Sequence, residues 1–341
     1  MTAPVVRPRS AHLRRVTGGA VLAATTALVL GACGAVVGVG AAPTATVGAA
    51  VEADRAQVVA TRVVDQARRA VAAPGPEGDA LRKAVFVGDA LAAARADARL
   101  AKVTSGTTLA QQALVDSPPV VLAVARDLGY PRTMVVQSSL KASGLPVLML
   151  LTTPDVRTPY RISASVSMLP GAQVPGFDPV ATGSPALTDA DTSATGRYTT
   201  LVEGYAASLA YPSSPRAVAP GITAGDAFGT AVRANASKQA AALASFGSFR
   251  QQHEARAISG GLRTAGGQSA LVFAVIERSD TVLVKSGSLT LTKAFTTLSG
   301  LRSVTSEADL STYEVVALVV PTSGAATVVG GEEHLYAAQG A

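Results

Sequence analysis

The distribution of hydrophobic and polar positions divides the chain into three regions. Residues 16–31 form an uncharged and mostly apolar run. Between residues 51 and 103, apolar side chains recur at helical spacing and charged side chains lie mostly on the other faces. From residue 104 onward, short runs rich in β-branched residues alternate with turn residues. The pattern therefore predicts an N-terminal apolar segment, then helices, then strands.

Helices are expected first in the part of the chain that follows the apolar segment. Residues 51–71 predict an amphipathic helix, because valines and alanines recur on one face. The Pro-Gly-Pro sequence at residues 74–76 ends this helix. An apolar stripe continues to residue 103, and Gly88 within it predicts a division into two helices.

Four short runs then predict a β-meander, at residues 120–125, 133–140, 146–152 and 160–168. The segments between them contain Pro and Gly, whose backbone dihedrals suit turns rather than strands. In the fourth run the apolar residues alternate with Ser163, Ser165 and Ser167. Because successive side chains of a strand point to opposite faces, we expect one buried face and one serine face in water.

A second cycle of helices and strands follows a stretch rich in Pro, Gly, Asp, Ser and Thr. Helices are expected at residues 198–210 and 227–249, and strands at residues 269–277, 281–285, 312–320 and 326–331. Helices before antiparallel strands, twice over, predict an α+β fold of two tandem domains, each with helices packed on a curved antiparallel sheet. The predicted domains are residues 51–180 and 196–341, with a linker at residues 181–195.

The N-terminal apolar run has the layout of a secretory signal peptide. Four arginines precede it, and no acidic residue occurs before Glu52. The run closes with Leu30-Gly31-Ala32-Cys33, which resembles the lipobox of bacterial lipoproteins. This resemblance implies that the Cys33 thiol receives a diacylglycerol and that residues 1–32 are removed as the signal peptide. Residues 33–50, which carry no charge, would then form a flexible tether.

An uncleaved transmembrane helix is the alternative interpretation of this segment. Residues 16–42 carry no charge, and about 20 apolar residues are enough to span a bilayer. Gly34 and Gly38 even form a GxxxG pair. Against this reading, six glycines lie between residues 18 and 40, and each lowers helix propensity by about 1 kcal/mol relative to Ala. Both readings place the bulk of the chain on the extracytoplasmic face of the cell membrane. The Arg14-Arg15 pair leaves open whether export is general or twin-arginine.

Composition adds two points to this picture. Cys33 is the only cysteine in 341 residues, so the exported part has no internal disulfide, and lipidation would explain a lone cysteine there. Arginine outnumbers lysine 23 to 6, and alanine and valine dominate, which is typical of a high-GC genome. We therefore do not interpret alanine-rich stretches as evidence of a function.

The net charge of +6 belongs mostly to the leader. Removal of its four arginines leaves 25 basic residues against 23 acidic ones, scattered among one another. The chain also has no Trp. A near-neutral surface without a basic patch lacks the electrostatic footprint of nucleic-acid binding, so we expect no nucleic-acid partner.

The order of helices and strands resembles the cone-shaped fold of nuclear transport factor two, in which helices pack into a curved antiparallel sheet. Three short sequences carry a narrower resemblance: Gly129-Tyr130-Pro131-Arg132, Pro159-Tyr160-Arg161 and Leu169-Pro170-Gly171-Ala172. Together with the closing strand at residues 315–320, they resemble an uncharacterised family of lipoproteins from high-GC Gram-positive bacteria. The resemblance covers residues 100–341 and implies tandem cone domains, of the nuclear transport factor two or cystatin type. Such a cone can enclose a ligand or serve in assembly, and the family implies no particular activity.

One sequence suggests acyl-enzyme chemistry. Ser138-Ser139-Leu140-Lys141 matches the S-x-x-K of penicillin-recognising enzymes, and Lys285-Ser286-Gly287 resembles their K-T-G strand. No S-D-N triplet lies between the two. Ser138 is expected at a strand end before a glycine turn, so a surface hairpin is the favoured interpretation.

Three groups of residues were weighed as metal ligands: His253-Glu254, the cluster Glu332, Glu333 and His334, and the pair Asp189 and Asp191. The first lacks the second His of H-E-x-x-H. Adjacent strand residues point to opposite faces, so the second is expected to be a solvated charge cluster near the C-terminus. The third is expected to supply helix caps or Asx turns. We therefore expect no metal site and no cofactor.

Two further features have plain interpretations. Asn235-Ala236-Ser237 fits a glycosylation sequon but lies in a predicted helix of a bacterial-looking chain. Tyr198 and Tyr205 share one helix face and are expected to pack in the core rather than line a pocket.

These observations favour a membrane-anchored, extracytoplasmic lipoprotein that is not an enzyme. It would act as a binding or scaffolding module at the cell envelope, attached to the membrane by its lipid anchor, with an envelope protein or a small molecule as its further partner. Two alternatives stay open. One is a cell-wall-directed serine acyl enzyme that uses Ser138 and Lys141, and the other is a solute-binding lipoprotein of a transporter.

Overall fold

The computed structural model describes residues 48–103, 113–126, 129–213, 219 and 221–341. The predictions for the leader and for Cys33 lie outside the described residues. Val47–Ala341 forms one compact unit, and its fold is α+β with antiparallel sheets, as the sequence predicts. Ala50 is buried, and its amide donates a hydrogen bond to the carbonyl of Ala125 (2.8 Å), so the end of the predicted tether belongs to the folded unit.

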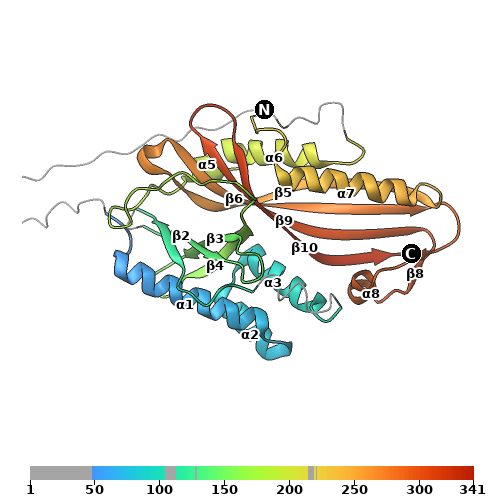
Figure 1. Ribbon diagram of the computed structural model, residues 1–341, viewed down its shortest axis with the longest axis horizontal. Coiled ribbons are helices and arrows are strands. Elements are labelled where there is room, and N and C mark those ends of the chain that lie inside the picture. The colour runs from blue at the N-terminus through green and yellow to red at the C-terminus, as the bar shows by residue number, and fades with distance from the viewer. Residues whose placement is uncertain (1–47, 104–112, 127–128, 214–218, 220) are drawn as a thin grey trace, which may run out of the picture. The chain divides into compact units, whose positions relative to one another are not determined.

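Two four-stranded antiparallel sheets form the centre of the unit (Figure 1). The first sheet has the order β1 (Val120–Val124), β2 (Arg132–Ser139), β3 (Pro146–Thr153) and β4 (Arg161–Ser167). The second has the order β10 (Thr327–Gly340), β9 (Glu307–Pro321), β6 (Ser269–Val284) and β5 (Gly247–Arg263). A small ribbon pairs β7 (Leu289–Thr290) with β8 (Ser303–Val304).

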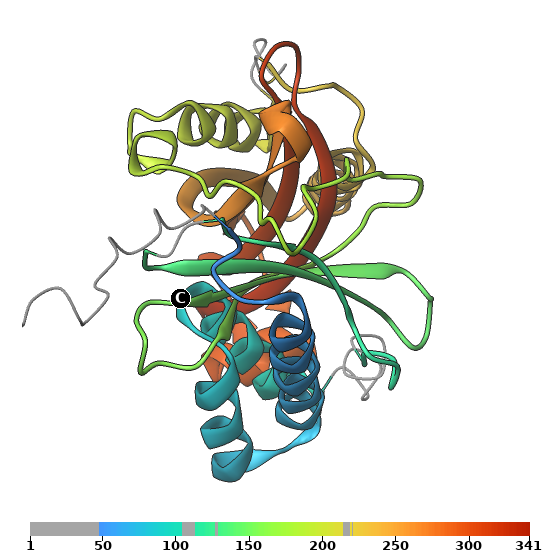
Figure 2. The same cartoon turned by 90° about the vertical axis from the view of Figure 1, so that its left-hand side faces the viewer.

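Helices cover the outer face of each sheet. The first sheet is covered by α1 (Ala53–Ala72), α2 (Gly75–Val85) and α3 (Gly88–Leu100). The second is covered by α6 (Arg197–Leu209) and α7 (Ala227–Leu243). The short elements are α5 (Asp189–Thr192), the 3₁₀ turn η1 (Ala265–Gly267) and α8 (Lys293–Ser299). Figure 2 shows the strands of the first sheet crossing those of the second. The helix α3 also packs against β10 of the second sheet.

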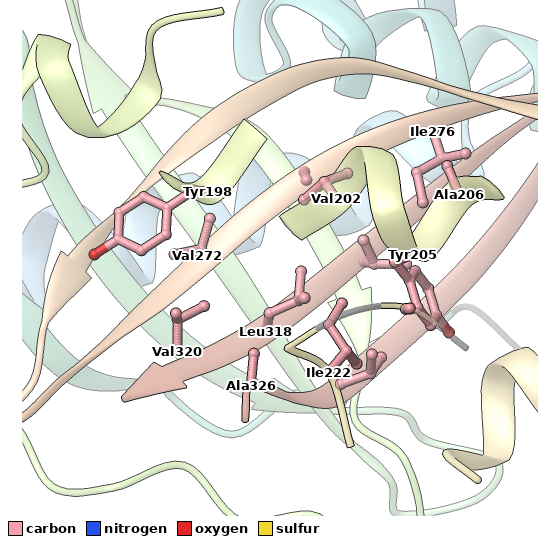
Figure 3. Packing of buried hydrophobic residues seen from close by; sticks show 14 of the residues in the cluster. Tyr198, Val202, Tyr205, Ala206, Ile222, Val272, Ile276, Leu318, Val320 and Ala326 are labelled. Carbon is pink, nitrogen blue, oxygen red and sulfur yellow. The ribbon is translucent and has the colours of Figure 1, made fainter. Parts of the chain in front are cut away.

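Three apolar layers hold these elements together. One lies between α1 to α3 and the first sheet, and another lies between α6, α7 and the second sheet, where Tyr205 is buried (Figure 3). The third lies between the two sheets and joins Leu148 and Leu150 of β3 to Phe273 and Val275 of β6. The inner faces of the two sheets therefore share one buried layer.

The sheet edges are also connected. At one edge Met168 pairs with Gly330, and the amide of Leu169 donates to the carbonyl of Val329 (2.8 Å). At the other edge Ser184 pairs with Ala125 of the first sheet, and Ala186 pairs with Leu262 of the second. The segment predicted as a linker, residues 181–195, is thus hydrogen-bonded to both sheets.

Most predicted elements of the first half are confirmed. The helix at residues 51–71, the division at Gly88 and the four strands of the meander all occur within one or two residues of their predicted bounds. Gly88 adopts a positive φ of 58°, which glycine accepts readily and other residues rarely adopt.

Two predictions for the second half are wrong. The helix expected at residues 227–249 ends at Leu243, and residues 247–263 form the long strand β5, which was not predicted. Residues 269–284 form the continuous strand β6 rather than two strands. Both strands were missed in these regions because Gln251 and Asp280 are polar yet buried, so the expected alternation of apolar side chains is missing.

Candidate functional site

A cavity of about 500 Å³ lies under α3, in the range of roughly 300 to 1,000 Å³ that is usual for small-molecule sites. Its walls come from α1, α3, the outer face of the first sheet and the inner face of the second sheet. The second sheet contributes because its strands are much longer than those of the first. The cavity is therefore built from both halves of the folded unit.

Small side chains leave this space open. Ala90, Ala93, Ala94 and Ala98 of α3 line it, and Ala67 of α1 faces it from the other helix. Larger apolar residues complete the wall: Val71, Phe86, Leu114, Leu140, Val147, Met149 and Ile162. The composition led us to discount the alanines of these helices. Their small side chains nevertheless leave room for the cavity.

The floor of the cavity contains the serines of β4. Ser163, Ser165 and Ser167 all line it, although the sequence predicted that this face lies in water. The reason is that both faces of β4 are covered: Ala164 and Val166 pack in the layer between the two sheets, so the alternating serines point toward the helices. All three serines are partly buried, and the Ser163 hydroxyl donates to the carbonyl of Leu150 (3.2 Å).

One end of the cavity is charged. His334 of β10 is buried, and its Nδ1 lies 2.9 Å from the Asp97 carboxylate of α3. Burial disfavours the charged imidazolium, but Asp97, with Glu332 and Glu333 nearby, raises the pKa of His334 to about 9. His334 is therefore protonated at neutral pH and forms an ion pair with Asp97.

The prediction of a solvated charge cluster at residues 332–334 is wrong for His334, which is buried. The three side chains do point to alternating faces, as expected for a strand. Glu332 and His334 line the cavity, whereas Glu333 pairs with Arg278 on the other face of β10. The sequence could not show that His334 is buried, because the helix that covers it, α3, is distant from it in the chain.

A second charged group lies at the exposed rim of the cavity. The Arg68 guanidinium contacts Asp65 and Asp116, and the Lys141 ammonium lies 2.8 Å from Asp116. Lys141 holds the pKa of Asp116 below its usual range. Lys141 and Asp116 are exposed, and Arg68 is partly buried. The pair of Lys141 with Asp116 therefore contributes little to stability.

The residues of the S-x-x-K sequence are not arranged as they are on a helix. The predicted hairpin is confirmed, because β2 ends at Ser139 and pairs with β3 after a turn that contains Gly144. Ser138 itself, however, is buried rather than at the surface. Lys141 lies beyond the strand end, and its ammonium bonds to Asp116. Ser138 is not among the residues that line the cavity, and Lys285 follows β6, in the other sheet.

A buried polar network lies on the outer face of the second sheet. His253 Nε2 lies 3.3 Å from Glu314 Oε1, which also accepts from Arg278 (3.0 Å). Asp280 accepts from Gln251 (2.8 Å), and burial raises the pKa of the Asp280 carboxyl. His253, which we considered as a metal ligand from the sequence, thus has its Nε2 engaged with Glu314.

The remaining candidates have structural roles. Asp191 completes a capping box with Thr188 at α5 and bonds to Arg263 (2.9 Å). This confirms the expected capping role for Asp191, and Asp189 lies in the first turn of α5. Tyr198 and Tyr205 pack in the core under α6, as predicted. Within the described ranges, no group of three or more His, Cys, Asp or Glu side chains has an arrangement suited to a metal ion.

Comparison with protein-family models, with curated proteins and with solved structures finds no match. In the part of the chain that the structure describes, no helix has both the length and the apolar character needed to cross a bilayer. The case for function therefore depends on the cavity and on the N-terminal sequence.

Proposed function

We propose that this chain is a membrane-anchored, extracytoplasmic lipoprotein whose folded unit binds an apolar small molecule in the cavity under α3. The main observation in support of this proposal is the cavity itself, which is lined by the alanines of α3 and has a mostly apolar wall. Apolar surface removed from water contributes roughly 25 cal/mol per Å², so an apolar ligand would gain affinity from most of this wall.

A non-catalytic role has support in the same geometry. Four charged groups of the cavity are engaged in pairs, His334 with Asp97 and Lys141 with Asp116. A nucleophile in hydrogen-bond contact with a base is the signature of covalent catalysis. Ser138 Oγ has no hydrogen-bond partner among the described residues, so the serine acyl enzyme has less support than a binding module.

The site of attachment in this proposal is Cys33. Small residues precede it in Leu30-Gly31-Ala32-Cys33, and two acyl chains hold a protein on a bilayer where one would dissociate. A solute-binding lipoprotein that passes its ligand to a transporter is the second candidate, and the cavity favours it as well. In both, the membrane is the partner of the lipid anchor.

The proposal also includes a more detailed description of the fold, as two tandem domains. Each half has helices that precede an antiparallel sheet and cover one of its faces. This repetition supports two tandem domains of the cone type, joined through the apolar layer between the sheets. A cone of this type can enclose a ligand between its helices and its sheet.

The cavity is tested by saturation binding of the apolar fluorophore N-phenyl-1-naphthylamine to the full chain. We expect saturable binding by the wild type and at least a tenfold loss of affinity in Ala94→Phe, because the new ring would occupy the cavity. Ala84→Phe is the matched control, since Ala84 is exposed on α2 and does not line the cavity. Absence of saturable binding by the folded wild type would show that the proposed function is wrong.

The anchor is tested by Cys33→Ala in the native host. We expect the variant to accumulate as an unprocessed precursor or to leave the membrane fraction, because the acyl acceptor is gone. Fractionation followed by immunoblotting distinguishes these outcomes from wild-type behaviour. Processing and membrane retention identical to those of the wild type would contradict the anchor.

A further inference from the structure

The charged side chains at the buried end of the cavity are engaged with one another. His334 is protonated at neutral pH, and its Nδ1 lies 2.9 Å from the Asp97 carboxylate. Glu332 is not free either, and its negative charge helps to raise the pKa of His334. A ligand ion placed at this end would lose its hydration without meeting a free counter-charge, which makes its burial unfavourable.

The charges at the rim of the cavity are also paired. Asp116 lies 2.9 Å from the Arg68 guanidinium and 2.8 Å from the Lys141 ammonium. Arg68 contacts Asp65 as well. The Asp116 side chain is 75% exposed, so salt screens the attraction that this group could offer to a ligand ion. The charged groups of the described lining therefore favour neither a cationic nor an anionic ligand.

The serines of β4 are lining groups with unused hydrogen-bonding capacity. Ser163, Ser165 and Ser167 are partly buried, and in the described part of the chain only the Ser163 hydroxyl among them has a partner, the carbonyl of Leu150 (3.2 Å). A serine hydroxyl has one proton to donate and two lone pairs to accept with. Ser165 and Ser167 thus each offer a donor and an acceptor to a ligand in the cavity.

Strand geometry sets the spacing of these two serines. Residues two apart on a strand point to the same face and lie about 6.6 Å apart. A hydrogen bond between two hydroxyls spans about 2.8 Å, so two neighbouring hydroxyls of one ligand can bond to Ser165 and Ser167 at the same time. The helix α3 packs against β4, and its alanines line the same cavity. Apolar surface therefore lies beside this pair of hydroxyls.

We propose that the cavity binds an uncharged amphiphile with an aliphatic chain and a head of two neighbouring hydroxyls, with the chain against the alanines of α3 and the head on Ser165 and Ser167. This inference rests on the proposed function and names the ligand class for the same cavity. The head satisfies both serines, whereas a purely apolar ligand would displace water from them and leave them without partners, which costs free energy.

Four ligands with the same chain test the head group. Dodecane-1,2-diol, dodecanol, dodecylamine and dodecanoate, each below its critical micelle concentration, would displace bound N-phenyl-1-naphthylamine from the full chain at pH 7. We expect the diol to bind at least fivefold more tightly than dodecanol and at least tenfold more tightly than either ion. Ala94→Phe should abolish the displacement by all four.

Serine variants then locate the head. Ser165→Ala combined with Ser167→Ala should reduce the ratio of diol to dodecanol affinity at least threefold, because both partners of the head are removed. Ser163→Ala is the matched control on the same strand and should leave the ratio unchanged, since the Ser163 hydroxyl already donates to Leu150. Both proteins should retain saturable fluorophore binding, which shows that the cavity is intact.

The outcomes separate this inference from the function on which it rests. Tighter binding of either ion than of the diol, or equal binding of the diol and dodecanol, overturns the inferred head group and leaves the apolar-ligand function standing. An unchanged ratio in the double serine variant, or an equal change in Ser163→Ala, overturns the placement of the head. Absence of saturable fluorophore binding by the wild type overturns both proposals.

Discussion

A single buried ion pair, between His334 and Asp97, connects β10 to α3 at the charged end of the cavity. Removing one partner of a buried pair leaves the other charge without compensation, which typically costs about 3–5 kcal/mol. The pair therefore helps to hold α3 over the cavity, and the protonation of His334 affects stability as well as charge.

The pH dependence of stability follows from the His334 pKa. It is about 9 in the folded chain against about 6.5 in the unfolded chain, so the folded state favours the protonated form. The resulting stabilisation is fully present below about pH 6.5 and is lost as the pH rises through 9, and it amounts to about 3 kcal/mol. Urea unfolding at pH 6 and pH 10 should show this loss for the wild type.

The comparison variant for this prediction is His334→Gln, which cannot titrate. Its free energy of unfolding should change between the two pH values by about 3 kcal/mol less than that of the wild type. Every other titrating group is common to both proteins, so the difference isolates His334. Parallel pH profiles for the two proteins would contradict the ion pair.

At the scale of elements, α2 is packed against the end of α1 through one glycine and one arginine. The Arg82 guanidinium is buried and donates to the α1 carbonyls of Ala70 (3.0 Å) and Ala73 (2.9 Å). Carbonyl groups at a helix end lack partners within the helix, and a cation there also interacts favourably with the helix dipole. Gly78 allows the close approach, since a Cβ atom at this position would lie 2.0 Å from the carbonyl oxygen of Ala73.

Gly78→Ala should therefore destabilise the protein, although alanine is the better helix former by about 1 kcal/mol. The steric conflict with Ala73 is with backbone, which cannot move aside without separating the two helices. We expect a net loss above 1 kcal/mol in chemical unfolding. Ala80→Gly, at an exposed position of the same helix, should cost about 1 kcal/mol through propensity alone. A stability gain in Gly78→Ala would refute the packing described here.

Elements with regular apolar patterns were predictable from sequence, and those with buried polar residues were not. The helix α1 and the strand β3 bury continuous apolar faces, so their periodicity is visible. In β5, the buried Gln251 and His253 interrupt the alternation, and in β6 Arg278 and Asp280 do the same. Those side chains form hydrogen bonds and ion pairs with one another across strands, and the sequence does not show which strands are neighbours.

The candidate site could not be predicted from the sequence, for a related reason. Its residues come from helices and strands up to 267 positions apart, from Ala67 to His334. Alanine carries no chemical signal, and the alternating pattern of β4 does not show that the helices cover its serine face while the second sheet covers the other. The sequence at Cys33 that resembles a lipobox, in contrast, is local, and lipidation there is a prediction from the sequence alone.

At the scale of the whole molecule, the two sheets share a buried apolar layer. Leu150 of β3 and Phe273 of β6 belong to the same cluster and are fully buried. Separation of the halves would expose this layer to water, at roughly 25 cal/mol per Å² of apolar surface. The cavity lies where the longer second sheet extends past the first and is covered by α3, so its shape depends on both halves. In the proposed function, the anchor would hold this cavity at the envelope as a ligand-binding module.

The measurement that tests this account most directly is the mass of the protein extracted from its own membranes, taken under native and then denaturing conditions. We predict a covalent mass of residues 33–341 plus acyl groups, and a bound ligand that is present in the native spectrum and absent after denaturation. An unmodified full-length mass would contradict the lipid anchor, and a mass that does not change on denaturation would contradict the occupied cavity.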